Sequence, residues 1–177
     1  MGDINTASKH EFVSTINKLF EAAPPLADYL YSHRPYESLA ALIDIAQAAV
    51  LSKPPIFNEQ QMLEIINAHP RLGAPKETLS EASLREQGGA SVVGGSSATI
   101  DAGSSQQQVD AILARINREY EDKFGFKLVE FVNGRSKADL VPVLQKRLDS
   151  GEVKAEMATA LTAMMDIARD RLRKSAV

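Results

Sequence analysis

The chain has 177 residues, of which 44% are hydrophobic and 24% charged, proportions that are ordinary for a folded globular domain. One domain, residues 1–177, is expected at this length. The net charge is −3, which argues against a nucleic-acid-binding surface, because such surfaces carry a clustered basic excess. The chain has no cysteine, which excludes disulfides, thiolate metal ligands and a cysteine nucleophile. No metal site is expected from the three dispersed histidines, His10, His33 and His69.

The sequence also carries no pattern typical of a membrane protein. No segment approaches the roughly 20 apolar residues that span a bilayer. The first ten residues are polar and lack the apolar centre of a signal peptide, and the last residues do not read Ser-Lys-Leu, the peroxisomal address. We therefore expect a cytoplasmic protein that binds no membrane, with the peroxisome as the alternative location.

Helical patterns begin near the N-terminus. Ser8 precedes Glu11 by three residues, which is the spacing of a capping box and predicts the start of a helix. Apolar residues then recur at helical intervals over residues 12–20. Pro24 and Pro25 are expected to stop this helix.

Two further helices are expected before residue 70. An apolar stripe covers residues 39–50, and Asn58 with Gln61 opens the next helix. That helix is expected to end near His69, because the residue that precedes a proline, here Pro70, is disfavoured in the α conformation.

The middle of the chain changes composition abruptly. Residues 80–88 predict a short helix that ends in glycine. Residues 88–108 are mainly Gly, Ala, Ser and Gln, and predict a flexible insert. Residues 109–124 then form the clearest apolar stripe in the chain, followed by Gly125 as the expected end of a helix.

The C-terminal part adds two more helices. Residues 128–132 form an apolar run that predicts either a strand or a buried extended segment, and Asn133-Gly134 predicts a turn. Either Ser136 or Asp139 caps the next helix, and the last helix covers about residues 152–174. The predicted fold class is therefore all-α, a compact single-domain bundle of seven or eight helices.

His69 is the position most informative about function. It lies at the predicted C-terminal end of a helix, where the helix dipole favours the imidazolium form. Pro70 restricts the backbone beside it. Two interpretations are open: a capping histidine at a junction between helix and loop, or a ring held in place for acid–base chemistry.

Ser83, Glu86 and Gln87 have spacings that place them on one face of a helix. Such a face offers a hydroxyl, a carboxylate and an amide to a small polar heterocycle, and Glu86 would tune a neighbouring histidine. The alternative is an ordinary solvated helix face.

The last helix carries three arginines near its end, Arg169, Arg171 and Arg173, where cations complement the helix dipole. Arg171 lies at the edge of the apolar face. From there it would be able to hold a substrate carboxylate in a planar fork.

Several strings of this sequence together resemble one family. Residues 68–73 (AHPRLG) and 79–87 (LSEASLREQ) resemble the signature of the 2-oxo-4-hydroxy-4-carboxy-5-ureidoimidazoline (OHCU) decarboxylases. The resemblance continues in shorter strings, namely residues 34–36, 116–126, 133–136 and 158–161. It extends from about Phe12 to Leu172, and the segment that follows Gln87 looks about ten residues longer than is usual in the family.

The resemblance implies site residues and a homodimer. The family's catalytic histidine falls on His69, with Glu86 as its partner. The substrate-binding positions fall on Pro70, Ser83, Gln87, Leu128, Val129, Glu130, Phe131, Val132 and Arg171. The stretch around residues 127–135 differs from the family in length and side chains, so its register on the family is open.

The implied reaction is the decarboxylation of OHCU to (S)-allantoin in urate and purine breakdown, with no cofactor and no metal. The substrate carries its own electron sink, a ring C=N beside the carbon that loses CO₂. Two alternatives stay open at this point. One is a non-catalytic helical binding module of the same fold, and the other is a different cofactor-free lyase or hydrolase that acts on a ureide.

Overall fold

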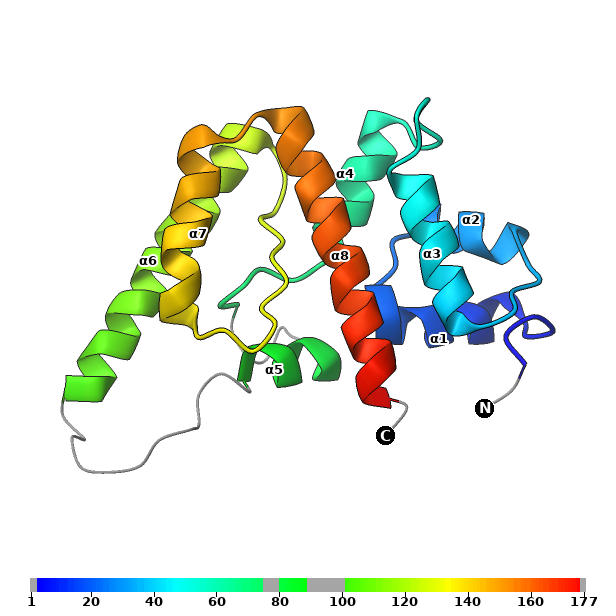
Figure 1. Ribbon diagram of the computed structural model, residues 1–177, viewed down its shortest axis with the longest axis horizontal. Helices are drawn as coiled ribbons and strands as arrows, with labels where there is room; N and C mark the ends of the chain where they lie inside the picture. The colour runs from blue at the N-terminus through cyan, green and yellow to red at the C-terminus, as the bar shows by residue number, and fades with distance from the viewer. Residues whose placement is uncertain (1–2, 75–79, 89–100, 176–177) are drawn as a thin grey trace. The chain divides into compact units, whose positions relative to one another are not determined.

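The computed structural model describes residues 3–74, 80–88 and 101–175, without the side chains of residues 82, 86–88, 101–105 and 150. Over these residues the chain forms eight α-helices and no strand (Figure 1). The predicted all-α class is therefore confirmed. None of the helices in the described part of the chain is long and apolar enough to cross a membrane.

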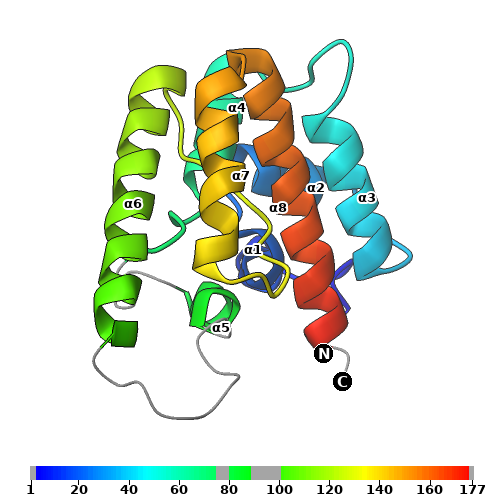
Figure 2. The same cartoon turned by 60° about the vertical axis from the view of Figure 1, so that its left-hand side comes forward.

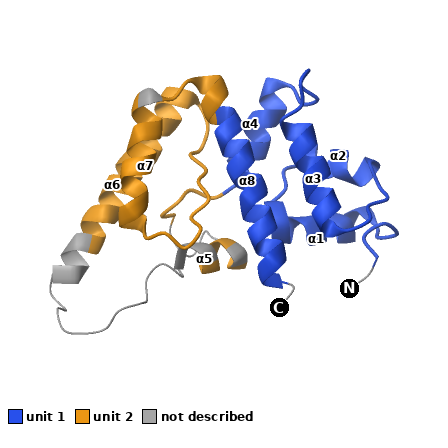
Figure 3. Cartoon of the chain, in the orientation of Figure 1, with its two compact units in different colours: residues 1–69, 157–177 blue, residues 70–156 orange. Residues whose placement is uncertain are grey.

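The chain divides into two compact units (Figure 3). Unit 1 contains residues 1–69 and 157–177, drawn in blue, and unit 2 contains residues 70–156, drawn in orange. The last helix, α8 (Val153–Ser175), begins in unit 2 and continues in unit 1. The expected single domain stays a prediction.

Unit 1 contains most of α8 and four helices from the N-terminal part: α1 (Lys9–Phe20), α2 (Pro24–Ser32), α3 (Leu39–Val50) and α4 (Glu59–Asn67). The capping boxes predicted at Ser8 and Asn58 are both present. The core consists of apolar side chains from all of these helices, among them Phe12, Ile16, Leu26, Leu30, Leu42, Ile43, Ile65, Ile66, Met164 and Ala168.

The helix α2 corrects the interpretation of the two prolines. Helix α1 ends at Phe20, where Glu21 takes a left-handed conformation (φ 53°), and Pro24 is the first residue of α2 rather than a stop signal. A proline is tolerated in the first turn of a helix, because the N–H that it lacks has no partner inside the helix. Leu26 and Leu30, one turn apart, are buried and hold α2 in the core.

Unit 2 contains α5 (Glu81–Gly88), α6 (Asp101–Phe124), α7 (Lys137–Ser150) and the first turn of α8. Helices α6 and α7 pack side by side (Figure 2). The apolar stripe predicted on α6 is buried, and side chains from α7 and from the segment after α6 complete the core: Leu113, Ile116, Tyr120, Phe124, Phe126, Leu128, Val129, Leu140 and Leu144.

The predicted short helix that ends at Gly88 is confirmed as α5. The prediction of a flexible insert over residues 88–108 is wrong at its second end, because residues 101–108 belong to α6. Composition misled here, because Gln and Ala form helices readily and their lack of large apolar groups does not prevent it. Residues 89–100 lie outside the described residues.

The segment between α6 and α7 is extended and buried at its start, and it does not form a strand within the described residues. Asn133 and Gly134 both have positive φ, 48° and 73°, and the Arg135 N–H donates to the Val132 carbonyl at 3.0 Å. The predicted turn is thus confirmed. Ser136, not Asp139, is the N-cap of α7.

Candidate active site

His69 follows directly on the end of α4, as predicted. Ala68 caps the helix, and the His69 N–H donates to the Ile66 carbonyl at 3.2 Å. The His69 side chain is only 3% exposed. Packing therefore holds the ring at this position.

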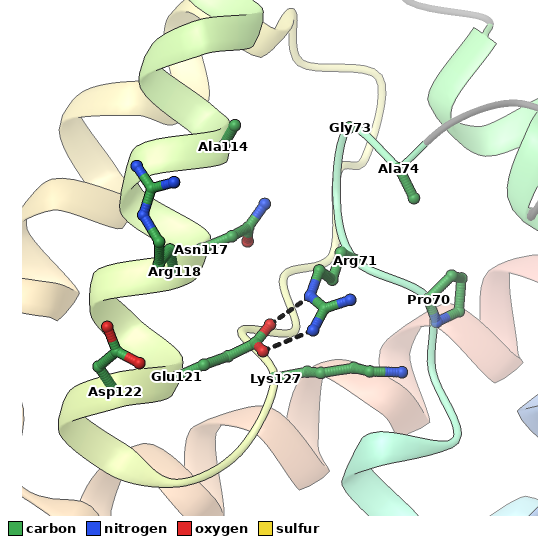
Figure 4. Close-up of a pocket in the computed structure, with 10 residues that line it drawn as sticks. All are labelled: Pro70, Arg71, Gly73, Ala74, Ala114, Asn117, Arg118, Glu121, Asp122 and Lys127. Atoms are coloured by element: carbon green, nitrogen blue, oxygen red, sulfur yellow. Dashed lines mark hydrogen bonds and ion pairs between the residues drawn. The ribbon is translucent and has the colours of Figure 1, made fainter.

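The chain after His69 runs as an irregular segment along α6. The Asn117 side chain donates to the Leu72 carbonyl at 2.9 Å, which fixes the segment to the helix. Arg71 forms a two-pronged ion pair with Glu121, with Nε–Oε1 at 2.5 Å and Nη2–Oε2 at 2.6 Å (Figure 4). The hydrogen bond to Glu121 raises the pKa of Arg71.

This segment and α6 enclose a pocket of about 560 Å³, a size that suits a small ligand. Three cationic and two anionic side chains line the pocket, together with polar and small residues (Figure 4). The lining residues are Pro70, Arg71, Gly73, Ala74, Ala114, Asn117, Arg118, Glu121, Asp122 and Lys127. Pro70 is the predicted site residue among them.

The helix α5 carries the second predicted group. Ser80 precedes the helix, and its hydroxyl oxygen accepts from the Ser83 N–H at 3.2 Å. The Ser80 hydroxyl also donates to the Ser83 hydroxyl at 3.1 Å, and Ser83 is buried. Glu86 and Gln87 belong to α5, so the helical spacing behind the prediction is present, and their side chains lie outside the described residues.

Arginines hold the predicted substrate-contacting segment, residues 128–132. Leu128 and Val129 are buried, and Phe131 and Val132 are half-buried. Arg135 donates to the Phe131 carbonyl and, through Nε, to the Val132 carbonyl at 3.1 Å. This segment therefore has side-chain partners along its backbone in place of a neighbouring strand.

The Glu130 carboxylate lies between two arginines. Its Oε1 accepts from Arg135 at 2.7 Å, and its Oε2 accepts from Arg147 at 2.9 Å. Arg147 also reaches the Val129 carbonyl at 2.8 Å and the Glu156 carboxylate at 2.9 Å.

Arg147 and Glu156 were not among the predicted site residues. Burial is the largest single effect and lowers the pKa of Arg147, but the hydrogen bond to Glu156 and the nearby Tyr120, Glu156 and Glu130 together outweigh it and raise that pKa. One signal pointed to it: Arg147 lies three residues after Leu144 and seven after Leu140, on the apolar face of α7.

Arg171 lies in unit 1, where it is 5% exposed. Its Nη1 donates to the Leu19 carbonyl at 3.2 Å, and its Nη2 pairs with Glu21 at 3.2 Å. Of the neighbouring arginines, Arg169 pairs with the exposed Asp44, and the exposed Arg173 pairs with the buried Asp170.

A model of the OHCU decarboxylase family matches residues 5–173 of this sequence. The chain belongs to the OHCU decarboxylase family. The resemblance seen in the short strings is thereby confirmed over almost the whole chain.

Curated relatives support the same family. The chain is 32% identical over 176 residues to the uric acid degradation bifunctional protein PucL of Bacillus subtilis, covering 97% of this chain but 32% of PucL, so it spans about a third of that relative. It is 31% identical over 175 residues to the 2-oxo-4-hydroxy-4-carboxy-5-ureidoimidazoline decarboxylase of Halalkalicoccus jeotgali, covering 99% of this chain and 90% of that protein.

Solved structures share the fold of the OHCU decarboxylase family with this chain. A crystal structure of OHCU decarboxylase in the presence of (S)-allantoin matches with a TM-score of 0.66 and 21% identity, over 95% of this chain and 97% of that one. A structure of (S)-allantoin synthase matches with a TM-score of 0.60 and 20% identity, over 97% of this chain and 52% of that one. The roles of the individual site residues stay predictions.

Proposed function

We propose that this chain decarboxylates 2-oxo-4-hydroxy-4-carboxy-5-ureidoimidazoline to (S)-allantoin in urate breakdown, without a cofactor. The observation that carries the proposal is the family match over residues 5–173, which includes the His69–Pro70 pair. The structure supports it, because His69 is buried at the end of α4 and Pro70 lines a pocket large enough for a small ligand.

The reaction needs little covalent help from the protein. The bond between the ring carbon and the carboxylate breaks, CO₂ leaves, and the electron pair moves toward the adjacent ring C=N. The nitrogen of that C=N takes up a proton. The carbon that bears the ureido group then gains a proton as well, and the hydroxyl on the neighbouring carbon loses its proton and becomes a carbonyl. Because the substrate is its own electron sink, the protein's tasks are orientation and control of protons.

His69 is the proposed acid–base group, either taking the hydroxyl proton or delivering a proton to the ring. Glu86 is its proposed partner, since a carboxylate stabilises the imidazolium form. Pro70, Ser83 and Gln87 are proposed to bind the substrate. Two further contacts are proposed, one from the 128–132 segment to the ring and one from Arg171 to the carboxylate. A dry site that protonates one face of the ring would yield one enantiomer.

The test is the stereochemistry of the product. Urate is oxidised and the first product hydrolysed by added enzymes, so that OHCU forms in the cuvette, and circular dichroism then follows the allantoin. With this protein, (S)-allantoin should accumulate faster than OHCU decays on its own. Racemic allantoin at the spontaneous rate would contradict the proposal, and loss of OHCU to another product would indicate a different lyase or hydrolase.

The resemblance also leads us to infer a homodimer. Sedimentation equilibrium at micromolar concentrations should give about twice the 19.2 kDa mass of the chain. A monomer at all concentrations would contradict this inference.

A further inference from the structure

Arg147 is the centre of a buried polar network in unit 2. Its side chain, on α7, is 10% exposed. Nη1 donates to the Val129 carbonyl at 2.8 Å and to Glu130 at 2.9 Å. Nε donates to Glu156 at 2.9 Å, and Nη2 donates to the Tyr120 hydroxyl at 3.3 Å. One guanidinium thus connects α6, α7, the start of α8 and the 128–132 segment.

Glu156 closes this network from the first turn of α8. Its Oε2 accepts from the Tyr120 hydroxyl at 2.7 Å, in addition to its bonds from Arg147. Burial, and after it this hydrogen bond, raises the pKa of Tyr120, so the hydroxyl keeps its proton and remains a donor.

Gly151 leaves room for this arrangement. A Cβ added at Gly151 would lie 2.5 Å from Cγ of Glu156 and 2.6 Å from the Arg147 carbonyl oxygen. No real Cβ contact is that short, so any larger residue would push Glu156 out of its place. Gly151 is therefore needed at the junction between α7 and α8.

The 128–132 segment depends on such contacts, because it has no partner strand within the described residues. Arg147 donates a hydrogen bond to the Val129 carbonyl of this segment. The Glu130 carboxylate accepts hydrogen bonds from both Arg147 and Arg135. An arginine suits this place, since its planar fork offers donors in several fixed directions. A lysine offers donors from a single nitrogen.

We propose that Arg147 is a positioning residue for the reaction. It holds the backbone of the 128–132 segment in the form that binds the substrate ring, and it does not itself touch the substrate. This inference rests on the proposed function, which assigns that segment to substrate binding. Glu156 and Tyr120 act indirectly, because they accept hydrogen bonds from Arg147 and so fix the direction of its guanidinium.

The test is Arg147→Lys, compared with Arg115→Lys as the matched control. Arg115 is a half-buried arginine of the same unit that pairs with Glu119 at 2.8 Å and Gln145 at 2.7 Å, and neither partner belongs to the 128–132 segment or to the Arg147 network. Both variants are assayed for (S)-allantoin formation at a temperature well below their melting points, and KM, kcat and the pH profile of kcat are measured.

Arg147→Lys should raise KM at least tenfold while kcat stays within threefold and its pH profile does not move, because the loss falls on binding and not on the acid–base group. Arg115→Lys should leave KM unchanged. Equal KM values for Arg147→Lys and the wild type would overturn the proposal. A wild type without activity would instead overturn the proposed function, and this inference with it.

A second variant covers the case in which Arg147→Lys does not fold. Tyr120→Phe removes one hydroxyl of the network and leaves the ring in the core. We expect KM to rise about threefold, because Arg147 then loses its Tyr120 acceptor and Glu156 loses its Tyr120 donor. A Tyr120→Phe variant with wild-type KM would contradict the proposed role.

Discussion

The ion pair between Arg171 and Glu21 should contribute strongly to the stability of unit 1. Glu21 follows α1 in a left-handed conformation, and its N–H donates to the Asn17 carbonyl at 3.2 Å. Arg171 donates to both Glu21 and the Leu19 carbonyl, so its charge lies where α1 carries partial negative charge. The change that tests this is Arg171→Met, which keeps most of the length of the side chain and removes its donors.

Removing one partner of a buried ion pair costs about 3–5 kcal/mol, because the other charge is left without compensation. Arg171 is 5% exposed, but the Glu21 side chain keeps 15% of its surface in contact with solvent and regains some hydration. We therefore expect the lower end, about 3 kcal/mol. At roughly 2–4 °C per kcal/mol for a protein of this size, the melting temperature should fall by about 6–12 °C.

Urea and thermal denaturation of Arg171→Met, Glu21→Gln and the double variant measure this cost and its coupling. The coupling free energy between the two residues should exceed about 1 kcal/mol. A loss below about 1 kcal/mol in Arg171→Met would refute the reasoning. Activity separates the two roles of Arg171: if it also holds the substrate carboxylate, Arg171→Met raises KM and Glu21→Gln does not.

Three further predictions follow from the site. Glu86→Gln should lower activity and move the acidic limb of the pH–rate profile to lower pH, because loss of the carboxylate lowers the pKa of the paired histidine; a wild-type profile would contradict this pairing. Gly73→Ala and Gly125→Ala should each destabilise the protein by about 1–2 kcal/mol in urea melts, since φ is +79° and +81° and neither Cβ meets an atom closer than 3.8 Å. Wild-type stability in either would contradict the strain argument. A metal chelator should leave activity unchanged, and a loss restored by one specific metal would contradict the cofactor-free mechanism.

Local signals explain which helix boundaries could be predicted. Ser8 and Asn58 pair with residues three positions later, so the sequence alone contains both partners of each capping box. Pro24 is ambiguous on local grounds, since proline ends one helix as readily as it begins the next. The burial of Leu26 and Leu30 in the folded protein is what favours a helix that begins at Pro24.

In the candidate site too, local sequence signals predict some features and miss others. The position of His69 at a helix end follows from Pro70, its neighbour in the chain, whereas its burial is a property of the folded protein that this local pattern does not contain. The Arg147 network joins α6, α7, α8 and the 128–132 segment, and no local pattern pairs such distant positions. The one sequence signal for this network was the position of Arg147, a charged residue, on the apolar face of α7.

The most direct test of the central claim, that His69 carries the acid–base chemistry of OHCU decarboxylation, is the turnover of His69→Asn. Asparagine keeps a polar side chain and removes the titrating ring. With OHCU formed in the cuvette, CO₂ release and (S)-allantoin should fall by a factor of about 10²–10⁴, while far-UV circular dichroism and the melting curve stay close to wild type. A folded His69→Asn variant within about threefold of wild-type kcat would contradict the assignment of His69, since an acid–base group contributes far more than that.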